Sequence, residues 1–156
     1  TPAAYAPQAA GLEVERTFLG RDGTPLAPGA AVPQGALVVV KFAVRATKGP
    51  LANVVLENLL PAGLEVENPR LATTERLPWM EAADENDAPA YLDMRDDRTL
   101  AFTDLADTKW HVSYALLRAV TPGSFTVPPA QAEAMYAPEL RAGGPISKLT
   151  VSAPVK

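Results

Sequence analysis

The sequence contains no cysteine and a single histidine, and these two shortages remove whole classes of function. Without thiols there is no disulfide, no cysteine-ligated zinc site and no thiol catalysis. His111 lies two residues before Ser113, so on a strand the two side chains would project in parallel from positions ~7 Å apart. A catalytic triad needs converging side chains and an orienting carboxylate. We therefore interpret His111 as a half-exposed strand residue and predict that the domain is not an enzyme.

Basic clusters and long apolar runs are also missing. The 14 Lys and Arg residues are scattered along a chain of net charge −4, which argues against nucleic-acid binding. No apolar run approaches the ~20 residues that span a bilayer, so we expect no direct membrane insertion by this domain. The GxGxxG, P-loop and HExxH motifs are absent, and we predict no cofactor.

Proline is abundant, with 16 residues, yet it is absent from the windows 34–49, 51–60 and 90–121. Central strands exclude proline because it removes a ladder donor, and the same windows collect β-branched and aromatic residues. These windows predict strands at residues 38–45, 53–60, 91–95, 98–103 and 110–120. We also predict a short strand at 64–66, after the turn Pro61-Ala62-Gly63, and a final strand at 146–151. Short strands at close intervals, with no long amphipathic helix, predict an all-β, Ig-like antiparallel β-sandwich with little helix.

Two stretches do not follow the strand pattern. Residues 72–90 hold Trp79, Met80 and an acidic run, and we predict a long acidic loop excursion there with a single helical turn. Residues 128–144 run from Pro128-Pro129 to a glycine pair, and we predict a second irregular loop. Loops longer than ~12–15 residues in a compact domain are often functional, so we look for function in these two stretches.

The acidic stretch invites a calcium hypothesis. Residues 75–98 hold eight acidic and three basic side chains, among them Asp84, Glu85 and Asp87. The spacing matches no calcium loop, and no glycine lies where an EF-hand turn needs one. We therefore predict no metal site and a solvated acidic face in which Arg95 and Arg98 form ion pairs.

The second stretch contains the adjacent residues Met135 and Tyr136. A flexible thioether beside a flat, amphipathic ring is typical of a protein contact. The residues alone leave two interpretations open: the pair contacts a partner, or both side chains fold back onto the core of the domain.

Six short motifs, in their order along the chain, resemble the last macroglobulin-like domain of bacterial α2-macroglobulins. The resemblance covers about residues 11–152, and it makes residues 1–10 a linker and 11–156 a single C-terminal macroglobulin-like domain. The motifs are NLLPAGLE at 58–65, NPRL at 68–71, MRDDR at 94–98, RAVTPGSF at 118–125, PP at 128–129 and AEAMYAPE at 132–139.

This resemblance implies a function that the residues do not show by themselves. Members of the family are periplasmic protease inhibitors, anchored to the inner membrane by an N-terminal lipid, in which a Cys–Gln thioester captures the attacking protease. The expected partners are therefore the thioester domain of the same polypeptide and, through the parent protein, the target proteases. Whether a cell-wall synthase accompanies the parent is left open.

The resemblance also assigns a role to Met135 and Tyr136. They match a Met-Tyr pair that covers the thioester and keeps water out until activation, which makes them the expected thioester-shielding contact. Since this chain has no cysteine, the thioester must lie elsewhere in the parent, and a sister branch of the family lacks it altogether. The alternative function is an Ig-like adhesion or binding module of a cell-envelope protein, which would bind its ligand in trans.

Overall fold

A computed structural model describes residues 8–27, 29–67, 79, 91–95 and 97–154 of the chain. Within these ranges no helix has the length and hydrophobicity that crossing a membrane requires. The described residues form strands β1 (Gln8–Ala10), β2 (Leu12–Leu19), β3 (Ala31–Pro33), β4 (Leu37–Ala46), β5 (Leu51–Leu59), β6 (Leu64–Val66), β7 (Tyr91–Met94), β8 (Arg98–Leu105), β9 (His111–Ala119), β10 (Gly123–Val127), β11 (Ala130–Ala134), β12 (Ala137–Gly143) and β13 (Ser147–Ser152).

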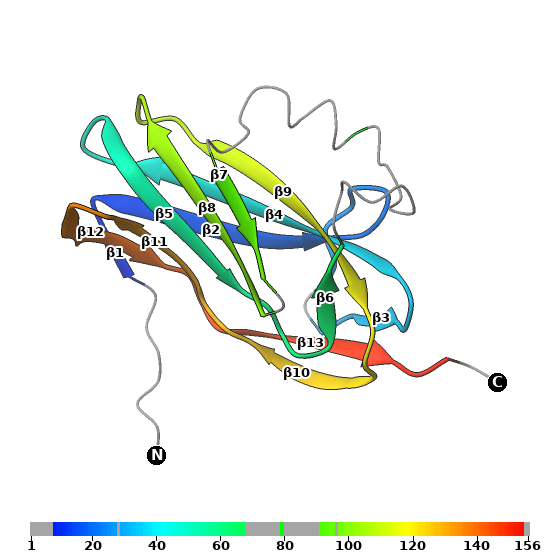
Figure 1. The fold of residues 1–156 in the computed structure, drawn as a ribbon. Coiled ribbons are helices and arrows are strands. Elements are labelled where there is room, and N and C mark those ends of the chain that lie inside the picture. The colour runs from blue at the N-terminus through cyan, green and yellow to red at the C-terminus, as the bar shows by residue number, and fades with distance from the viewer. Residues whose placement is uncertain (1–7, 28, 68–78, 80–90, 96, 155–156) are drawn as a thin grey trace, which may run out of the picture.

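The strands form three sheets that pack as a sandwich (Figure 1). One layer is a four-stranded sheet in the order β2-β4-β9-β6. The opposite layer is divided into a six-stranded sheet, β1-β12-β11-β5-β8-β7, and a three-stranded sheet, β10-β13-β3. The strand pairs are antiparallel apart from β3 with β13. The predicted all-β antiparallel sandwich is therefore confirmed.

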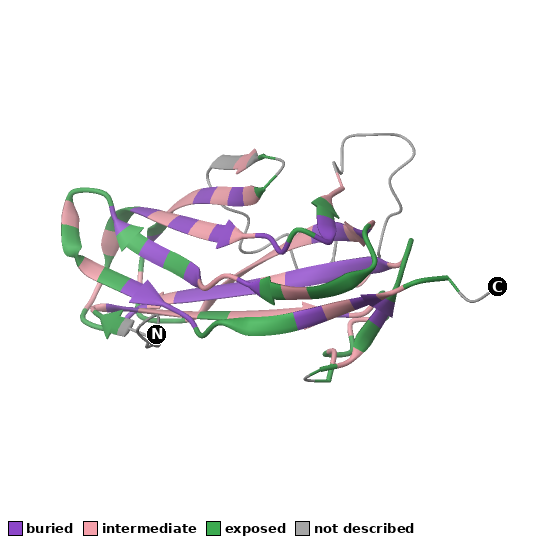
Figure 2. Cartoon of the chain, turned by 90° about the horizontal axis from the view of Figure 1, so that it is seen from below, coloured by how far each residue is buried: buried purple, intermediate pink, exposed green. Residues whose placement is uncertain are grey.

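The core is divided in the same way as the layers. Figure 2 colours the buried residues of the strands purple. One buried cluster joins the six-stranded sheet to one half of the four-stranded sheet, with Phe42 and Val44 facing Leu56 and Ala132. A second cluster joins the three-stranded sheet to the other half, through residues such as Val38 and Leu149. A long β4 thus contributes to both clusters, and it holds the two parts of the opposite layer in one domain.

Arg16 lies where the opposite layer divides. It shares the inner face of β2 with Phe18, and its guanidinium donates to Asn58 Oδ1 at 2.9 Å and to the Pro128 carbonyl at 2.6 Å. Burial lowers the pKa of Arg16 to about 10. The chain passes from β10 to β11 through Pro128-Pro129, and proline nitrogens cannot donate to a ladder. Arg16 therefore supplies a hydrogen-bond donor at the point where the chain leaves the three-stranded sheet and enters the six-stranded sheet.

The predicted strands are confirmed, with one difference in β4. The alternation over 38–45 predicted a half-buried strand, yet both faces of β4 are buried near its start, and Val39 is 0% exposed. The outer face is covered there by Leu19 and Leu116, with Trp79 packed against them. The Trp79 ring meets Tyr114 edge-on at 5.7 Å, and Trp79 Nε1 donates to the Arg21 carbonyl at 2.9 Å.

Two sequence predictions are corrected. Residues 128–144 are not an irregular loop, because they contain the antiparallel strands β11 and β12. The predicted linker, residues 1–10, ends in β1, which pairs with β12 at the edge of the six-stranded sheet. Strands β2, β3 and β10 were not predicted either. The predicted acidic excursion, 72–90, lies outside the described residues apart from Trp79.

The turn after β5 generates a stability prediction. A Cβ atom added to buried Gly63 would overlap the Phe125 ring, while the Gly63 carbonyl accepts the Val120 amide at 2.9 Å and so resists displacement. We expect Gly63→Ala to lower the free energy of unfolding by ~1–3 kcal/mol, the usual cost of overpacking. Urea denaturation of the 156-residue chain measures this.

Gly144→Ala is the matched control. A Cβ there would lie no closer than 3.8 Å to its nearest neighbour, the Ala130 carbonyl oxygen, so its effect on stability should be small. Equal unfolding midpoints for the two variants would contradict the packing described for Gly63.

Candidate contact site at the β11–β12 hairpin

Met135 and Tyr136 form the two-residue turn between β11 and β12, whose ends pair as Ala134 with Ala137. Their residues are 49% and 82% exposed, and the other large hydrophobic residue of comparable exposure in the described chain is Ile146, at 47%. The interpretation in which the pair folds back onto the core is therefore wrong. The hairpin presents a thioether and an aromatic ring to the surroundings of the domain.

In β11, buried alanines alternate with exposed polar residues, and the buried face packs the hairpin against the core. Ala130, Ala132 and Ala134 are buried against the core, while Gln131 and Glu133 face outward. Successive strand residues point to opposite faces, and alanine fills the narrow space beside β2 and β5. The register of β11 on β5 is continuous from Ala130 opposite Asn58 to Ala134 opposite Val54. One residue further, the Met135 amide donates to the Asn53 carbonyl at 2.9 Å.

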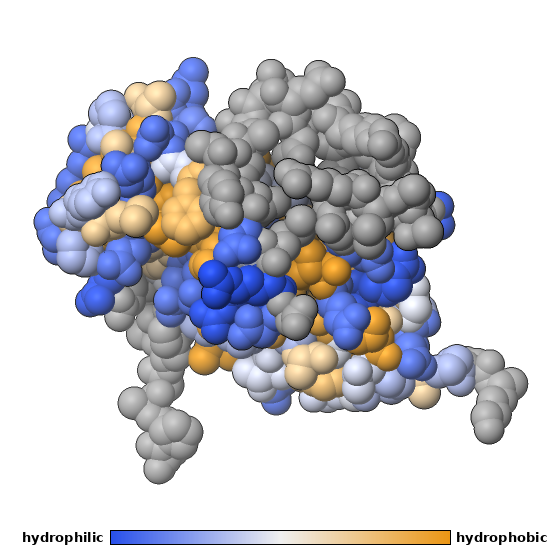
Figure 3. Space-filling model, viewed as in Figure 1, coloured by the Kyte–Doolittle hydropathy of each residue, from blue (hydrophilic) through white to orange (hydrophobic). Residues whose placement is uncertain are grey.

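A hollow of about 290 Å³ adjoins the turn on the outer face of the six-stranded sheet. Its lining includes the apolar Val55 and Met135 and the carboxylates of Glu57 and Glu133. Glu57 is paired with Arg98 at 3.1 Å. Figure 3 shows this side of the molecule, with hydrophobic groups set among hydrophilic ones. A projecting turn beside a shallow, mixed surface suits contact with another protein surface, where apolar anchors are surrounded by polar groups.

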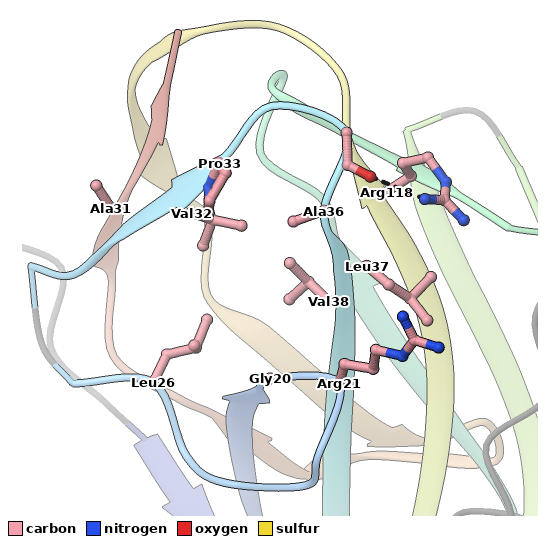
Figure 4. A pocket seen from close by; sticks show the side chains of 11 residues that line it. Gly20, Arg21, Leu26, Ala31, Val32, Pro33, Ala36, Leu37, Val38 and Arg118 are labelled. Carbon is pink, nitrogen blue, oxygen red and sulfur yellow. Dashed lines mark hydrogen bonds between the residues drawn. The ribbon is translucent and has the colours of Figure 1, made fainter. Parts of the chain in front are cut away.

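A second hollow, of about 380 Å³, lies between β3, the start of β4 and the chain around Gly20 (Figure 4). Leu26, Val32 and Val38 contribute apolar side chains to it, and Arg118 borders it. Arg118 is held by Glu67, at 2.6 Å from Oε1, and by the Gly35 carbonyl at 2.8 Å. The lining residues include no carboxylate, hydroxyl, thiol or imidazole, so this hollow offers no acid–base or nucleophilic chemistry.

His111 and Ser113 lie on β9 opposite Val44 and Phe42, respectively. His111 is half-buried, and its Nε2 lies 3.1 Å from Asp107 Oδ1. The same Asp107 oxygen accepts the Lys109 amide at 2.9 Å. That backbone hydrogen bond, with a smaller contribution from His111, lowers the pKa of Asp107. The carboxylate therefore closes the turn between β8 and β9.

The acidic residues near β7 form ion pairs where they are described. Asp93 lies 3.0 Å from Arg95, and Asp97 lies 3.0 Å from Arg98. The described parts of the chain contain no group of three or more His, Asp or Glu residues arranged to hold a metal ion. Asp84, Glu85, Asp87 and Asp96 lie outside the described residues.

The divided antiparallel sandwich and its projecting hairpin define a macroglobulin-like β-domain. Residues 11–139 match the family described as the bacterial alpha-2-macroglobulin MG10 domain, and the chain belongs to this family.

Bacterial alpha-2-macroglobulins align with nearly all of this chain. It is 36% identical over 149 residues to alpha-2-macroglobulin of Xylella fastidiosa strain Temecula1, and 32% identical over 155 residues to that of Escherichia coli K12. These alignments cover 90% and 92% of the chain but only 9% of each relative. The chain thus spans about a tenth of the length of these relatives.

Solved structures agree with this assignment. Salmonella alpha-2-macroglobulin reacted with methylamine matches with a TM-score of 0.84 and 33% identity, over 97% of this chain and 10% of that one. Escherichia coli alpha-2-macroglobulin activated by porcine elastase matches with a TM-score of 0.86 and 32% identity, over 97% of this chain and 14% of that one.

The exposure of the hairpin turn leads to a prediction about stability. Replacing both Met135 and Tyr136 with Ser should change the free energy of unfolding by less than ~0.5 kcal/mol, because exposed side chains away from special features contribute little. Thermal and urea denaturation of the 156-residue chain measure this. Leu117→Ala, at a position 0% exposed, is the positive control and should cost ~2–5 kcal/mol. A loss in the double variant as large as that of the control would mean that the turn serves the fold.

Proposed function

We propose that this domain is the last macroglobulin-like domain of a protease-inhibiting bacterial alpha-2-macroglobulin, and that its hairpin turn contacts and shields a thioester in the same polypeptide. The observation that carries the proposal is the projection of Met135 and Tyr136, at 49% and 82% exposure, from a hairpin that is buried along β11. Because the backbone of the hairpin is already paired in the sheet, a partner that covers the turn orders the two side chains and little more of the backbone.

The chemistry of a thioester explains why these two side chains suit the task. Hydrolysis destroys the thioester when water attacks its acyl carbon, and closing a site against water prevents such side reactions. Methionine adapts its shape to an irregular surface. Tyrosine adds a wide apolar ring with a hydroxyl that reaches a polar partner or solvent. Together they form a small lid that excludes water without catalysing anything.

Two relatives support the thioester and the inhibitor role. The Salmonella protein reacts with methylamine, and the Escherichia coli protein is activated by elastase. Methylamine is an amine nucleophile: attack on an acyl thioester forms an amide and releases a thiol. Because the chain spans about a tenth of the Escherichia coli relative, at 9%, capture of proteases belongs to the parent protein. The domain's own part is then non-catalytic.

The proposal extends to the place where the parent acts. As the family resemblance implies, the parent is periplasmic, and an N-terminal lipid anchors it to the inner membrane. In this arrangement the domain meets the thioester domain of its own polypeptide directly, and it meets target proteases only through the parent.

The test is the rate of spontaneous thioester loss in the full parent chain. Replacing Met135 and Tyr136 with Ala should raise this rate about tenfold, the change that ~1.4 kcal/mol of lost protection would cause. Titration of the thiol released over time in protease-free buffer gives the rate. Ile146→Ala is the matched control, since Ile146 is similarly exposed, at 47%, but lies outside the hairpin, and it should leave the rate unchanged.

An unchanged rate in the double variant would overturn the shielding role. The adhesion module, as the alternative, predicts a different pattern. There the same substitutions would weaken binding to a separate protein, and the parent would release no thiol at all.

A further inference from the structure

The strand that supports the hairpin turn contains a β-bulge. In the β5–β8 pair, Leu51 lies opposite Leu105 and Val54 lies opposite Thr103. Ala52 and Asn53 therefore face one residue, Asp104. Asn53 has a φ of 56°, and within the described residues it is the one non-glycine residue with a positive φ. A bulge with its extra residue in the left-handed region bends the strand and commonly re-aims a neighbouring group.

Two hydrogen bonds connect this bulge to the hairpin turn. The backbone amide of Asn53 donates to Asp104 Oδ1 at 2.8 Å, and the backbone carbonyl of Asn53 accepts the Met135 amide at 2.9 Å. The first bond involves a charged carboxylate, and such bonds are about twice as strong as neutral ones. A side chain of β8 thereby holds the backbone N–H of Asn53, and the carbonyl of the same residue holds the first residue of the turn.

The other side of the hairpin gives the turn less support. Ala134 pairs with Ala137, but Glu133 pairs with Arg141, so residues 138–140 bulge out of the β11–β12 ladder. Pro138 lies in this bulge and has no amide hydrogen to donate. The pairing of β11 with β12 is thus interrupted next to the pair Ala134–Ala137. The bond from Met135 to Asn53 extends the pairing of β11 with β5 by one residue, into the turn.

We propose that Asn53 and Asp104 are positioning residues that hold the Met135–Tyr136 turn in the orientation needed to cover its partner, an inference that rests on the shielding function proposed above. Asparagine suits the position because its short polar side chain tolerates the left-handed region, as glycine does, whereas alanine is strained there. Asp104 suits it because a carboxylate opposite the bulge accepts the amide that the bulge leaves outside the ladder.

The test uses the full parent chain and two measurements on each variant. The first is hydrogen exchange at the Met135 amide, which reports directly whether the turn is held. The second is the rate of spontaneous thioester loss, which reports whether a held turn matters. Asp104→Ala and Asn53→Ala should each speed exchange at Met135 about tenfold, as loss of a charge-assisted hydrogen bond or of its geometry implies, and should speed thioester loss in parallel.

Conservative variants separate positioning from general stability. Asp104→Asn keeps an oxygen acceptor without the charge, so its Met135 exchange and thioester lifetime should lie between those of the parent and of Asp104→Ala. Asn53→Gly keeps access to positive φ and should retain the parental values of both. Asp22→Ala is the matched control, because Asp22 likewise accepts a backbone amide, that of Thr24 at 3.0 Å, in an exposed turn outside the hairpin. It should alter neither measurement.

The outcomes distinguish this inference from the proposed function. Unchanged Met135 exchange in Asp104→Ala and Asn53→Ala would overturn the positioning role, whatever happens to the thioester. Faster exchange with an unchanged thioester lifetime, while Met135→Ala/Tyr136→Ala shortens that lifetime, would also overturn it. If the Met135→Ala/Tyr136→Ala variant leaves the lifetime unchanged, the shielding function fails, and with it the purpose assigned to Asn53 and Asp104.

Discussion

The passage of the chain through Pro128-Pro129 is the constraint on which the rest of the domain depends. Two successive residues without amide hydrogens end the pairing of β10 with β13. The chain then changes sheet and pairs with β5 from Ala130 onward. Arg16 of β2 donates to the Pro128 carbonyl at this break. The register that begins at Ala130 decides which residues reach the end of the six-stranded sheet.

That register links the packing of the domain to the exposed Met135–Tyr136 turn. Because β11 is short and its inward side chains are alanines, it lies close to the core and brings Met135 level with Asn53. The register is shifted on either side of the turn, at residues 52–53 of β5 and at residues 138–140 of β12. The hairpin is therefore held along its length by packing and at its turn by a few hydrogen bonds. Such an arrangement gives a binding element a defined direction while its side chains stay exposed.

Much of the fold could be predicted from the sequence, and the limits have physical causes. β4 is rich in β-branched residues, β9 has Val112, Tyr114 and Leu116 on one face, and both strands exclude proline, so pattern alone located them. β11 escaped because alanine carries little hydrophobic or β-forming signal, and its burial depends on how closely two distant strands approach. The positive φ of Asn53 arises from pairing with Asp104, 51 residues away, which no local pattern records. Met135 and Tyr136 were identified through family resemblance, since their chemistry alone slightly favoured burial against the core.

The most direct test of the account is to replace Tyr136 in the full parent chain with a photo-crosslinking amino acid and to map the products by mass spectrometry. The account predicts one dominant crosslink in the intact protein, to the thioester-bearing domain of the same polypeptide, and its loss after a protease activates the chain. Crosslinks to separate proteins, or a pattern that activation leaves unchanged, would contradict it.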